Sequence, residues 1–445
     1  MAIATQGQLL NSEQALDLID AVIQQSQAEG VFVRLSAGES ALTRFSENQI
    51  SQNVIKTSLK LTITSYFGQK CASAATTDLD TDAIAQTLQR SEELARFAPD
   101  DPEWTPLLPP QDYEDRTPGF DAETANIAPI TRGQRLEQIC RLSQKAGVDG
   151  SGKLSTDVDL LAIGNSLGLR ACDRQTEANF HFTARIDNGS AWSSDTAIAI
   201  DDLPLRTTAE TIIERAQNAR NPRSIQPGVY PVIFNNAAMA TFISWLSWGN
   251  FDARAADEGR SFMSRSDGEG NRLGEALFSP LVTLQRQADH PLLQSRRFFT
   301  DGLPNTPLTI ADKGIPQNLA YSRYWAQKTG NQPTGSFSPL VMSGSGASLA
   351  DLIAQTERGI LVNRAWYVRD VNPRTCEVTG MTRDGTFWIE DGKIAYPIKN
   401  LRFNQTIPDL LRDVEAVSQV KRYGNVIAPG AKVKGFNFSS ITDSI

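Results

Sequence analysis

Short apolar segments separated by glycine-containing turns fill the second half of this chain, and they limit the folds that it can adopt. From residue 277 onward most segments are only a few residues long, and one helical pattern, over residues 348–357, interrupts them. Many short strands with turn residues between them are typical of β-barrels and β-sandwiches. We therefore predict a β-rich C-terminal domain with a barrel-like or sandwich-like sheet.

The first half mixes helical and strand patterns. Apolar residues at helical spacing predict helices over residues 81–97, 130–146 and 207–218, whereas alternation predicts strands over residues 58–64 and 154–162. A chain of 445 residues exceeds one ordinary hydrophobic core. Proline-containing segments near residue 225 indicate a boundary. The sequence therefore predicts the α+β class, with an α+β domain over residues 1–225 and the β-rich domain over residues 226–445.

The composition excludes several classes of protein. The formal net charge is −8, which argues against the clustered lysines and arginines of a broad nucleic-acid-binding surface. No apolar run is long enough to predict a membrane span, and residues 1–11 lack the pattern of a secretory signal. The four cysteines are scattered without C-x-x-C pairs, so we expect no disulfide framework and a reducing, cytoplasmic location.

Histidine, the commonest ligand of catalytic zinc and the commonest general base, is scarce. The two histidines are His181, in an alternating segment, and His290, in a loop, and we interpret both as structural. A zinc hydrolase that needed no partner would have to use both histidines or rely on carboxylates. Cys376 lies in a turn without a neighbouring base, so we interpret it as an inert thiol.

Three blocks of sequence occur in a characteristic order. Residues 44–52 read RFSENQISQ, residues 227–234 read PGVYPVIF before an apolar helix over 236–248, and a third block covers residues 338–419. In this order and at these separations, the blocks resemble the TldD/PmbA family, the "modulator of DNA gyrase" metalloproteases. The resemblance covers most of the chain.

The zinc-bearing members of that family carry His-Glu-x-x-x-His on the middle helix and a cysteine near the C-terminus. Here Ser244 stands at the first histidine, Trp245 at the glutamate and Gly249 at the second histidine. The counterpart of the cysteine turn, residues 421–425, contains Tyr423 and no cysteine. The resemblance therefore implies the PmbA/TldE branch, with no metal or catalytic residue in this chain and zinc in a TldD-type partner.

Three functions stay open at this point. The resemblance implies a TldE-like subunit that pairs with a zinc-bearing TldD-like subunit and completes a chamber in which unfolded peptide is cleaved. The first alternative is a stand-alone homodimer that binds peptide or protein without cleaving it. The second is a hydrolase with a relocated site, built on Cys376 or on the carboxylates of residues 252–258.

Some further residues have both a functional and a structural interpretation. The tryptophans of the middle helix could face a chamber or a partner, or could pack in the core. Residues 44–52 could form an ordinary exposed strand or an edge that accepts a peptide by β-addition. The charges of residues 252–260 fit salt bridges better than a metal site. The chamber or interface candidates are Trp248, Arg260, Arg44 and Asn48.

Overall fold

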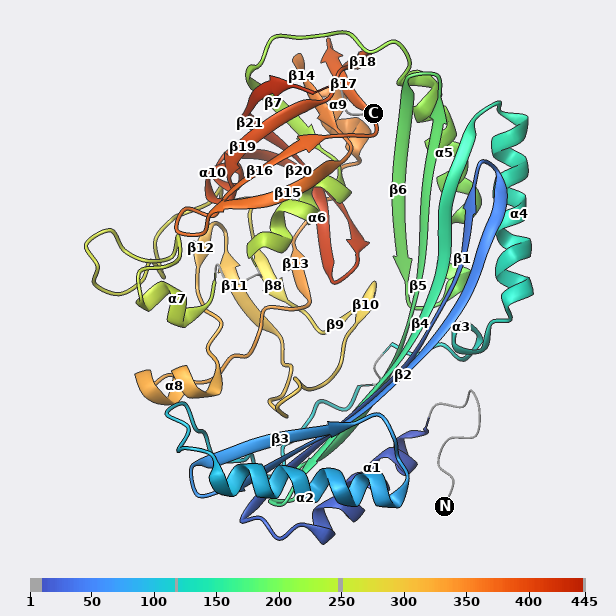
Figure 1. Ribbon diagram of the computed structural model, residues 1–445. Helices are drawn as coiled ribbons and strands as arrows, with labels where there is room; N and C mark the ends of the chain where they lie inside the picture. Colours follow the sequence, from blue (N-terminus) through green and yellow to red (C-terminus); the bar gives the residue numbers. More distant parts are fainter. Residues whose placement is uncertain (1–9, 117–118, 247–250, 443–445) are drawn as a thin grey trace.

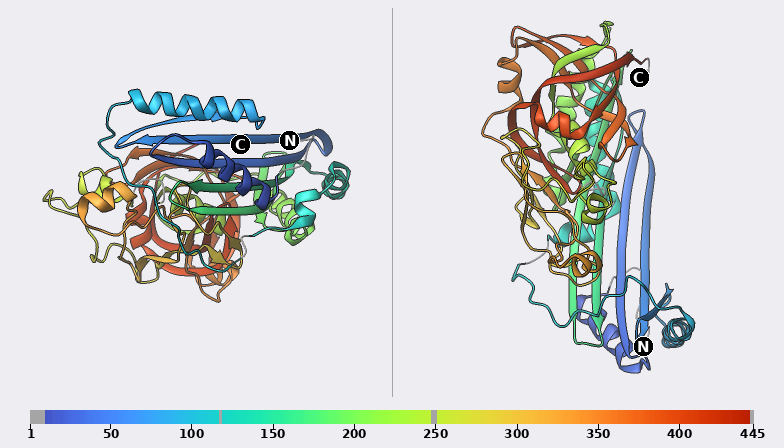
Figure 2. Two further views of the ribbon diagram at one scale, coloured as in Figure 1. Left: turned by 90° about the horizontal axis from the view of Figure 1, so that it is seen from below. Right: turned by 90° about the vertical axis from the view of Figure 1, so that its left-hand side faces the viewer.

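Two large β-sheets organise the computed structural model, which describes residues 10–116, 119–246 and 251–442 (Figure 1). The N-terminal sheet has the antiparallel order β3-β2-β1-β4-β5-β6. It runs along the length of the molecule, and the C-terminal region packs beside it (Figure 2). Its strands are β1 (Gly30–Ser46), β2 (Gln49–Phe67), β3 (Lys70–Thr76), β4 (Asp149–Asn165), β5 (Arg170–Ile186) and β6 (Gly189–Ala197).

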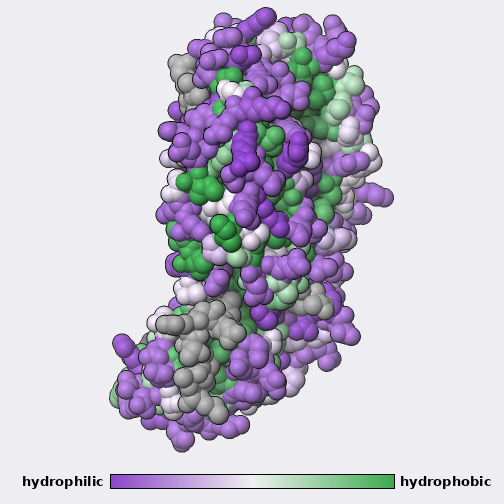
Figure 3. All heavy atoms as spheres, turned by 90° about the vertical axis from the view of Figure 1, so that its right-hand side faces the viewer, coloured by the Kyte–Doolittle hydropathy of each residue, from purple (hydrophilic) through white to green (hydrophobic). Residues whose placement is uncertain are grey.

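Helices cover one face of this sheet as two groups. At one end, α1 (Ser12–Gln25) and α2 (Thr81–Phe97) share a core with β1, β2 and β4. At the other end, α4 (Pro129–Lys145) and α5 (Leu205–Asn218) share a core with β4, β5 and β6. The short helix α3 (Ala122–Asn126) precedes α4 in the chain, and a 3-10 turn, η1 (Ile200–Asp202), precedes α5. The side of the molecule that carries α4 is mostly hydrophilic with scattered apolar groups (Figure 3).

The C-terminal sheet is open and branched. Its main path is β12-β11-β8-β13-β21-β7-β14-β17-β18, and β15, β16, β19 and β20 branch from it. The strands on this path and its branches are β7 (Gly228–Phe234), β8 (Leu284–Arg286), β11 (Leu308–Asp312), β12 (Ile315–Pro316), β13 (Leu340–Met342), β14 (Arg358–Val362), β15 (Ala365–Asn372), β16 (Glu377–Thr382), β17 (Thr386–Glu390), β18 (Lys393–Ile398), β19 (Leu401–Thr406), β20 (Val414–Tyr423) and β21 (Val426–Ile441).

Short elements complete this region. The strands β9 (Asp289–His290) and β10 (Leu293–Gln294) pair with each other. The helices are α6 (Asn236–Trp245), α7 (Ala253–Asp257), α8 (Arg323–Thr329), α9 (Leu349–Ala354) and α10 (Ile407–Arg412). The predicted α+β class with a β-rich C-terminal region is confirmed, although the described strands do not close into a barrel. No helix within the described ranges is long and apolar enough to cross a membrane.

One local prediction is corrected by the fold. Residues 44–52, which the sequence analysis read as one exposed strand or as a peptide-accepting edge, form the tip of the β1–β2 hairpin. The turn residues Glu47 and Asn48 both have positive φ, at 51° and 58°. Two successive residues with positive φ match a hairpin turn whose twist suits the flanking strands, and asparagine adopts this conformation readily. The chain reverses here because the turn geometry, and not the apolar pattern, decides the local structure.

Candidate functional site

The helix α6 is held inside the C-terminal core. The Asn235 side chain caps it by accepting a hydrogen bond from the Ala238 amide at 3.0 Å. Next to the cap, Asn236 Nδ2 donates to the carbonyls of Gln419 and Ala428 at 2.8 and 2.9 Å, which joins the helix to β20 and β21. Buried side chains, among them Phe242, pack it against the sheet. The start of α6 is therefore fixed by hydrogen bonds, and the rest of the helix is held by packing in the core.

The described residues at the C-terminal end of α6, and Tyr423 on β20, lack the properties of metal ligands. Ser244 Oγ donates to the Thr241 carbonyl within the helix at 2.7 Å, and Trp245 packs against the C-terminal core. Tyr423, at the end of β20, packs against the C-terminal core, and burial and then the Asp195 charge raise the pKa of its phenol above the usual range. The predicted positions Trp248 and Gly249 lie outside the described residues.

Zinc of the kind that the family resemblance implies does not fit the donors that the described residues offer at this place. Neutral imidazoles, thiolates and carboxylates are the usual ligands of zinc, whereas Ser244 and Trp245 offer a hydroxyl that is hydrogen-bonded to the helix and an indole. The histidines lie on other elements, His181 on β5 and His290 on β9. Within residues 10–116, 119–246 and 251–442, no group of three or more His, Cys, Asp or Glu side chains could hold a metal ion.

A cavity of about 900 Å³ lies between the N-terminal sheet and the C-terminal region. Leu246 and Phe251, which line it, flank the undescribed residues 247–250, and Arg422 lines it next to Tyr423. The cavity therefore borders the part of α6 and β20 where the sequence placed the degenerate metal site. The sheet contributes Asp157, Asp159, Leu161, Gln175, Thr176 and Glu177, and the C-terminal region adds residues that include Asp252, Arg296, Phe298, Phe299, Asp301 and Arg323.

An ion pair between a buried arginine and a half-buried glutamate closes one wall of the cavity. Arg422 NH2 and Glu177 Oε2 form a short contact between β20 and β5. The same guanidinium donates to the carbonyls of Gly424 and Leu292 at 2.9 and 3.2 Å. Burial lowers the pKa of Arg422, and the Glu177 charge opposes this shift. Because the two residues come from different sheets, the pair fixes the C-terminal region against the N-terminal sheet at the cavity.

Two further arginines link the sheets. Arg297 pairs with the fully buried Asp173 of β5, with a shortest contact of 2.7 Å. Arg364 lies over the rings of Trp192 and Trp366, 3.9 and 4.2 Å from their centroids. Cation–π contacts of this kind strengthen when they are shielded from water. Together with the ion pair at the cavity, these contacts favour one fixed arrangement of the two sheets.

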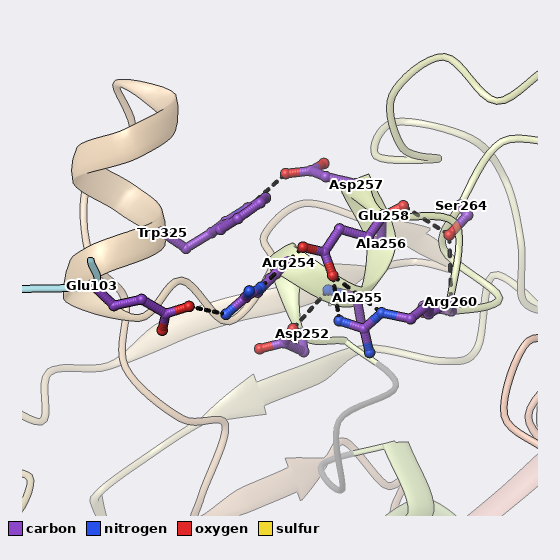
Figure 4. Close-up of polar contacts among 11 residues, drawn as sticks. Glu103, Asp252, Arg254, Ala255, Ala256, Asp257, Glu258, Arg260, Ser264 and Trp325 are labelled. Atoms are coloured by element: carbon purple, nitrogen blue, oxygen red, sulfur yellow. Dashed lines mark hydrogen bonds and ion pairs between the residues drawn. The ribbon is translucent and has the colours of Figure 1, made fainter. Parts of the chain in front are cut away.

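The charged run after α6 forms a network of ion pairs, as the sequence predicted (Figure 4). Arg254 contacts Glu103 at 2.8 Å and Glu258 at 3.0 Å, and Glu258 also contacts Arg260 at 2.6 Å. Arg260, a candidate for the chamber or an interface, is therefore an exposed member of this network. The two aspartates of the run also have structural roles: Asp252 accepts from the Ala255 amide at 2.7 Å, and Asp257 accepts from Trp325 Nε1 at 2.8 Å.

The structural interpretation of the cysteine and histidines is supported by their surroundings. Cys376 is 1% exposed, and burial raises its pKa to about 12, which opposes a role as nucleophile. His181 faces Ser194 and Trp192, and burial lowers its pKa to about 4. The ring of His290 accepts a hydrogen bond from the Leu292 amide at 3.1 Å.

Arg44 and Asn48 occupy the β1–β2 hairpin. Asn48 fastens the turn to the start of β4, because its Nδ2 donates to the Val148 carbonyl and its Oδ1 accepts from the Gly150 amide, both at 2.8 Å. Its amide group is thus used in a local structural role. Arg44 is exposed on β1, and no ion pair is formed by its side chain within the described part of the chain.

The sequence analysis missed the residues that line the cavity. Asp157 and Asp159 belong to a predicted strand, and their spacing of two residues places both side chains on one face. That alternation was a usable signal. No comparable signal existed for Arg296 and Arg422, because they reach the cavity through sheet pairing and loop packing far along the chain.

Comparisons with known proteins agree with this architecture. Three family models match in order: PmbA/TldA metallopeptidase domain 1 over residues 31–95, the central domain over 122–220, and the C-terminal domain over 227–440. Metalloprotease PmbA of Escherichia coli O157:H7 is 24% identical over 92% of this chain and 93% of its own length. A PmbA homologue of Haemophilus influenzae is 24% identical over 83% of each chain.

The fold has also been observed experimentally in a related protein. The crystal structure of TldE from Thermococcus kodakarensis superposes with a TM-score of 0.86 at 17% identity, covering 95% of this chain and all of that one. At that identity the likeness shows the fold alone. The three domain matches cover most of the chain in the expected order, and the chain therefore belongs to the PmbA/TldD family of metallopeptidases.

Proposed function

We propose that this chain is a PmbA/TldE-type subunit of a cytoplasmic metalloprotease that acts on unfolded peptides. In this proposal the chain is not catalytic, and a TldD-type partner carries the zinc. One observation carries the proposal: the middle helix is intact and packed in the core, but it presents Ser244 and Trp245 where zinc-bearing members have a histidine and a glutamate. The scaffold is kept while its ligands are replaced.

Two further features support this role. The cavity lies beside the end of that helix, where a peptide held by this chain would be close to the degenerate site. The four cysteines are all free, as expected for a reducing compartment. The net charge of −8 favours a protein or peptide partner over direct binding to nucleic acid.

The proposal is tested by separating metal from activity. The chain is purified alone and together with a zinc-bearing family member, and metal content is measured by mass spectrometry alongside cleavage of an unfolded peptide. We expect no stoichiometric zinc and no cleavage for the chain alone, and cleavage by the pair. Ser244→Ala should leave cleavage by the pair unchanged, whereas loss of the partner's zinc ligands should abolish it. Stoichiometric zinc and cleavage in this chain alone would contradict the proposal.

A second candidate is a stand-alone homodimer that binds peptide without cleaving it. It is favoured by the fact that residues of a single chain suffice to form the cavity. Light scattering after size exclusion separates the candidates. A stable self-dimer that does not exchange with the zinc-bearing protein would support the binding protein, and a mixed dimer would support the subunit.

A further inference from the structure

Two aspartates of the cavity wall have no ionic or hydrogen-bonding partner for their side chains within the described ranges. Asp157 and Asp159 lie on β4 and point to the same face of the sheet, as residues two apart in a strand do. Their Cα atoms are about 7 Å apart by strand geometry. The register pairs them with Glu177 and Gln175 of β5, so they continue the cavity floor formed by that strand.

The other charged groups of the cavity are already engaged. Glu177 pairs with Arg422. Asp252 and Asp301 accept hydrogen bonds from backbone amides, and Arg323 donates to the Pro106 carbonyl. The lining contains five carboxylates and three guanidinium groups, so it carries a formal excess of negative charge. That excess resides mainly on the two unpaired aspartates of β4.

A third group, independent of the aspartates, also lacks a partner. The Nε atom of Arg296 is buried and has no hydrogen-bond acceptor. Burial raises the pKa of Asp159 and the nearby charge of Arg296 opposes that shift, yet the two side chains form no ion pair within the described part of the chain. A buried donor without an acceptor is costly. The same two residues also line a second, smaller cavity of about 320 Å³.

This combination of groups suits one kind of ligand. Unpaired carboxylates call for a cation, the guanidinium group of Arg296 calls for an acceptor oxygen, and the half-buried Phe299 offers apolar surface to an aliphatic stem. A metal ion fits poorly, because no third ligand of a suitable type joins the two aspartates. A free polyamine would satisfy the aspartates but would leave the arginine without an acceptor.

We propose that the cavity binds an extended peptide at a lysine or arginine residue, whose cationic side chain lies between Asp157 and Asp159 while a peptide carbonyl accepts from Arg296. The cavity volume falls within the range of sites that enclose small ligands or peptide side chains. The inference rests on the proposed function only for its choice of a peptide ligand. It adds a preference for basic residues and the groups of this chain that impose it.

The test measures binding by the purified chain alone, so it is independent of any partner or cleavage. Fluorescence anisotropy compares three labelled unstructured peptides that differ at one central residue, lysine, glutamine or glutamate. We expect the lysine peptide to bind about tenfold more tightly than the glutamine peptide, since a charged hydrogen bond replaces a neutral one. The preference should weaken as salt is added. Equal affinities for the lysine and glutamine peptides, or no binding at all, would overturn the proposal.

Variants then assign the contacts. Asp157→Asn combined with Asp159→Asn should remove the preference for lysine. Arg296→Gln should instead lower the affinities for the lysine and glutamine peptides to a similar degree. Asp267→Asn is the matched control, because that aspartate is exposed and pairs with Arg265 in another part of the chain. Thermal unfolding of each variant checks that it is folded.

Two outcomes of these assays count against the proposal. The aspartate variants could keep the lysine preference, which would place the cation elsewhere. A free polyamine could compete as strongly as the lysine peptide, which would identify a polyamine site. If no zinc-bearing partner associates but the lysine preference holds and depends on the two aspartates, the subunit role fails while the peptide site stands.

Discussion

The ion pair between Arg422 and Glu177 should be a principal link between the two sheets, and its removal gives a measurable loss of stability. Arg422→Met keeps much of the aliphatic volume and removes the guanidinium. The side chain of Arg422 is 7% exposed and that of Glu177 is 32% exposed. Breaking one side of a buried, hydrogen-bonded pair costs about 3–5 kcal/mol.

For Arg422→Met we expect a loss of stability smaller than that range. Because about a third of the Glu177 side chain is exposed, water can partly solvate the carboxylate that is left unpaired. We therefore expect the free energy of unfolding to fall by about 2–3 kcal/mol. Glu177→Gln in the same chain should recover about 1 kcal/mol, since the unpaired charge is then absent.

Urea denaturation followed by tryptophan fluorescence measures both values as shifts of the midpoint. The matched control is Arg206→Met, which breaks an exposed pair with Glu210 on α5 whose arginine side chain is 77% exposed. That change should cost about 0.5 kcal/mol or less. The reasoning is refuted if the Arg422 and Arg206 variants are equally stable, or if the double variant shows no coupling between its two sites.

Other predictions follow from single contacts. Asn48→Ala should lower the free energy of unfolding by about 2 kcal/mol, because the variant loses two hydrogen bonds and because alanine, unlike asparagine, rarely adopts a positive φ. Asn48→Gly loses the same hydrogen bonds but tolerates that φ, so its free energy of unfolding should fall less in the same urea titration. Cys376 should react with a thiol reagent at pH 8 only after urea unfolds the chain, since burial raises its pKa to about 12, and rapid labelling of the native protein would contradict this. Burial also raises the pKa of Asp159, so its ionisation destabilises the folded state as pH rises above the ordinary aspartate pKa of about 4. Asp159→Asn should therefore raise the thermal midpoint at pH 7, with the gain disappearing below about pH 4; a variant less stable than the parent at pH 7 would show that the carboxylate stabilises the fold.

The sequence by itself determined those features of the protein that depend on residues close together in the chain. The helical stripes of α2, α4 and α5 and the short strands after residue 277 follow from side-chain periodicity, since each periodicity allows one buried face. The resemblance likewise predicts Ser244 and Trp245 as degenerate metal-site positions from their place on the middle helix. The hairpin at residues 44–52 was missed, because its turn depends on two residues with positive φ, and the pattern of apolar residues does not reveal a positive φ.

Only the tertiary structure decided which distant groups meet at the cavity. Alternation alone places Asp157 and Asp159 on one face of β4, but it cannot say what that face opposes. The register of β4 with β5 brings Glu177 alongside, and the packing of the C-terminal region against the sheet adds Arg296 and Arg422. Such contacts join residues more than a hundred positions apart in sequence. They depend on the simultaneous packing of both sheets, and no local pattern encodes that arrangement.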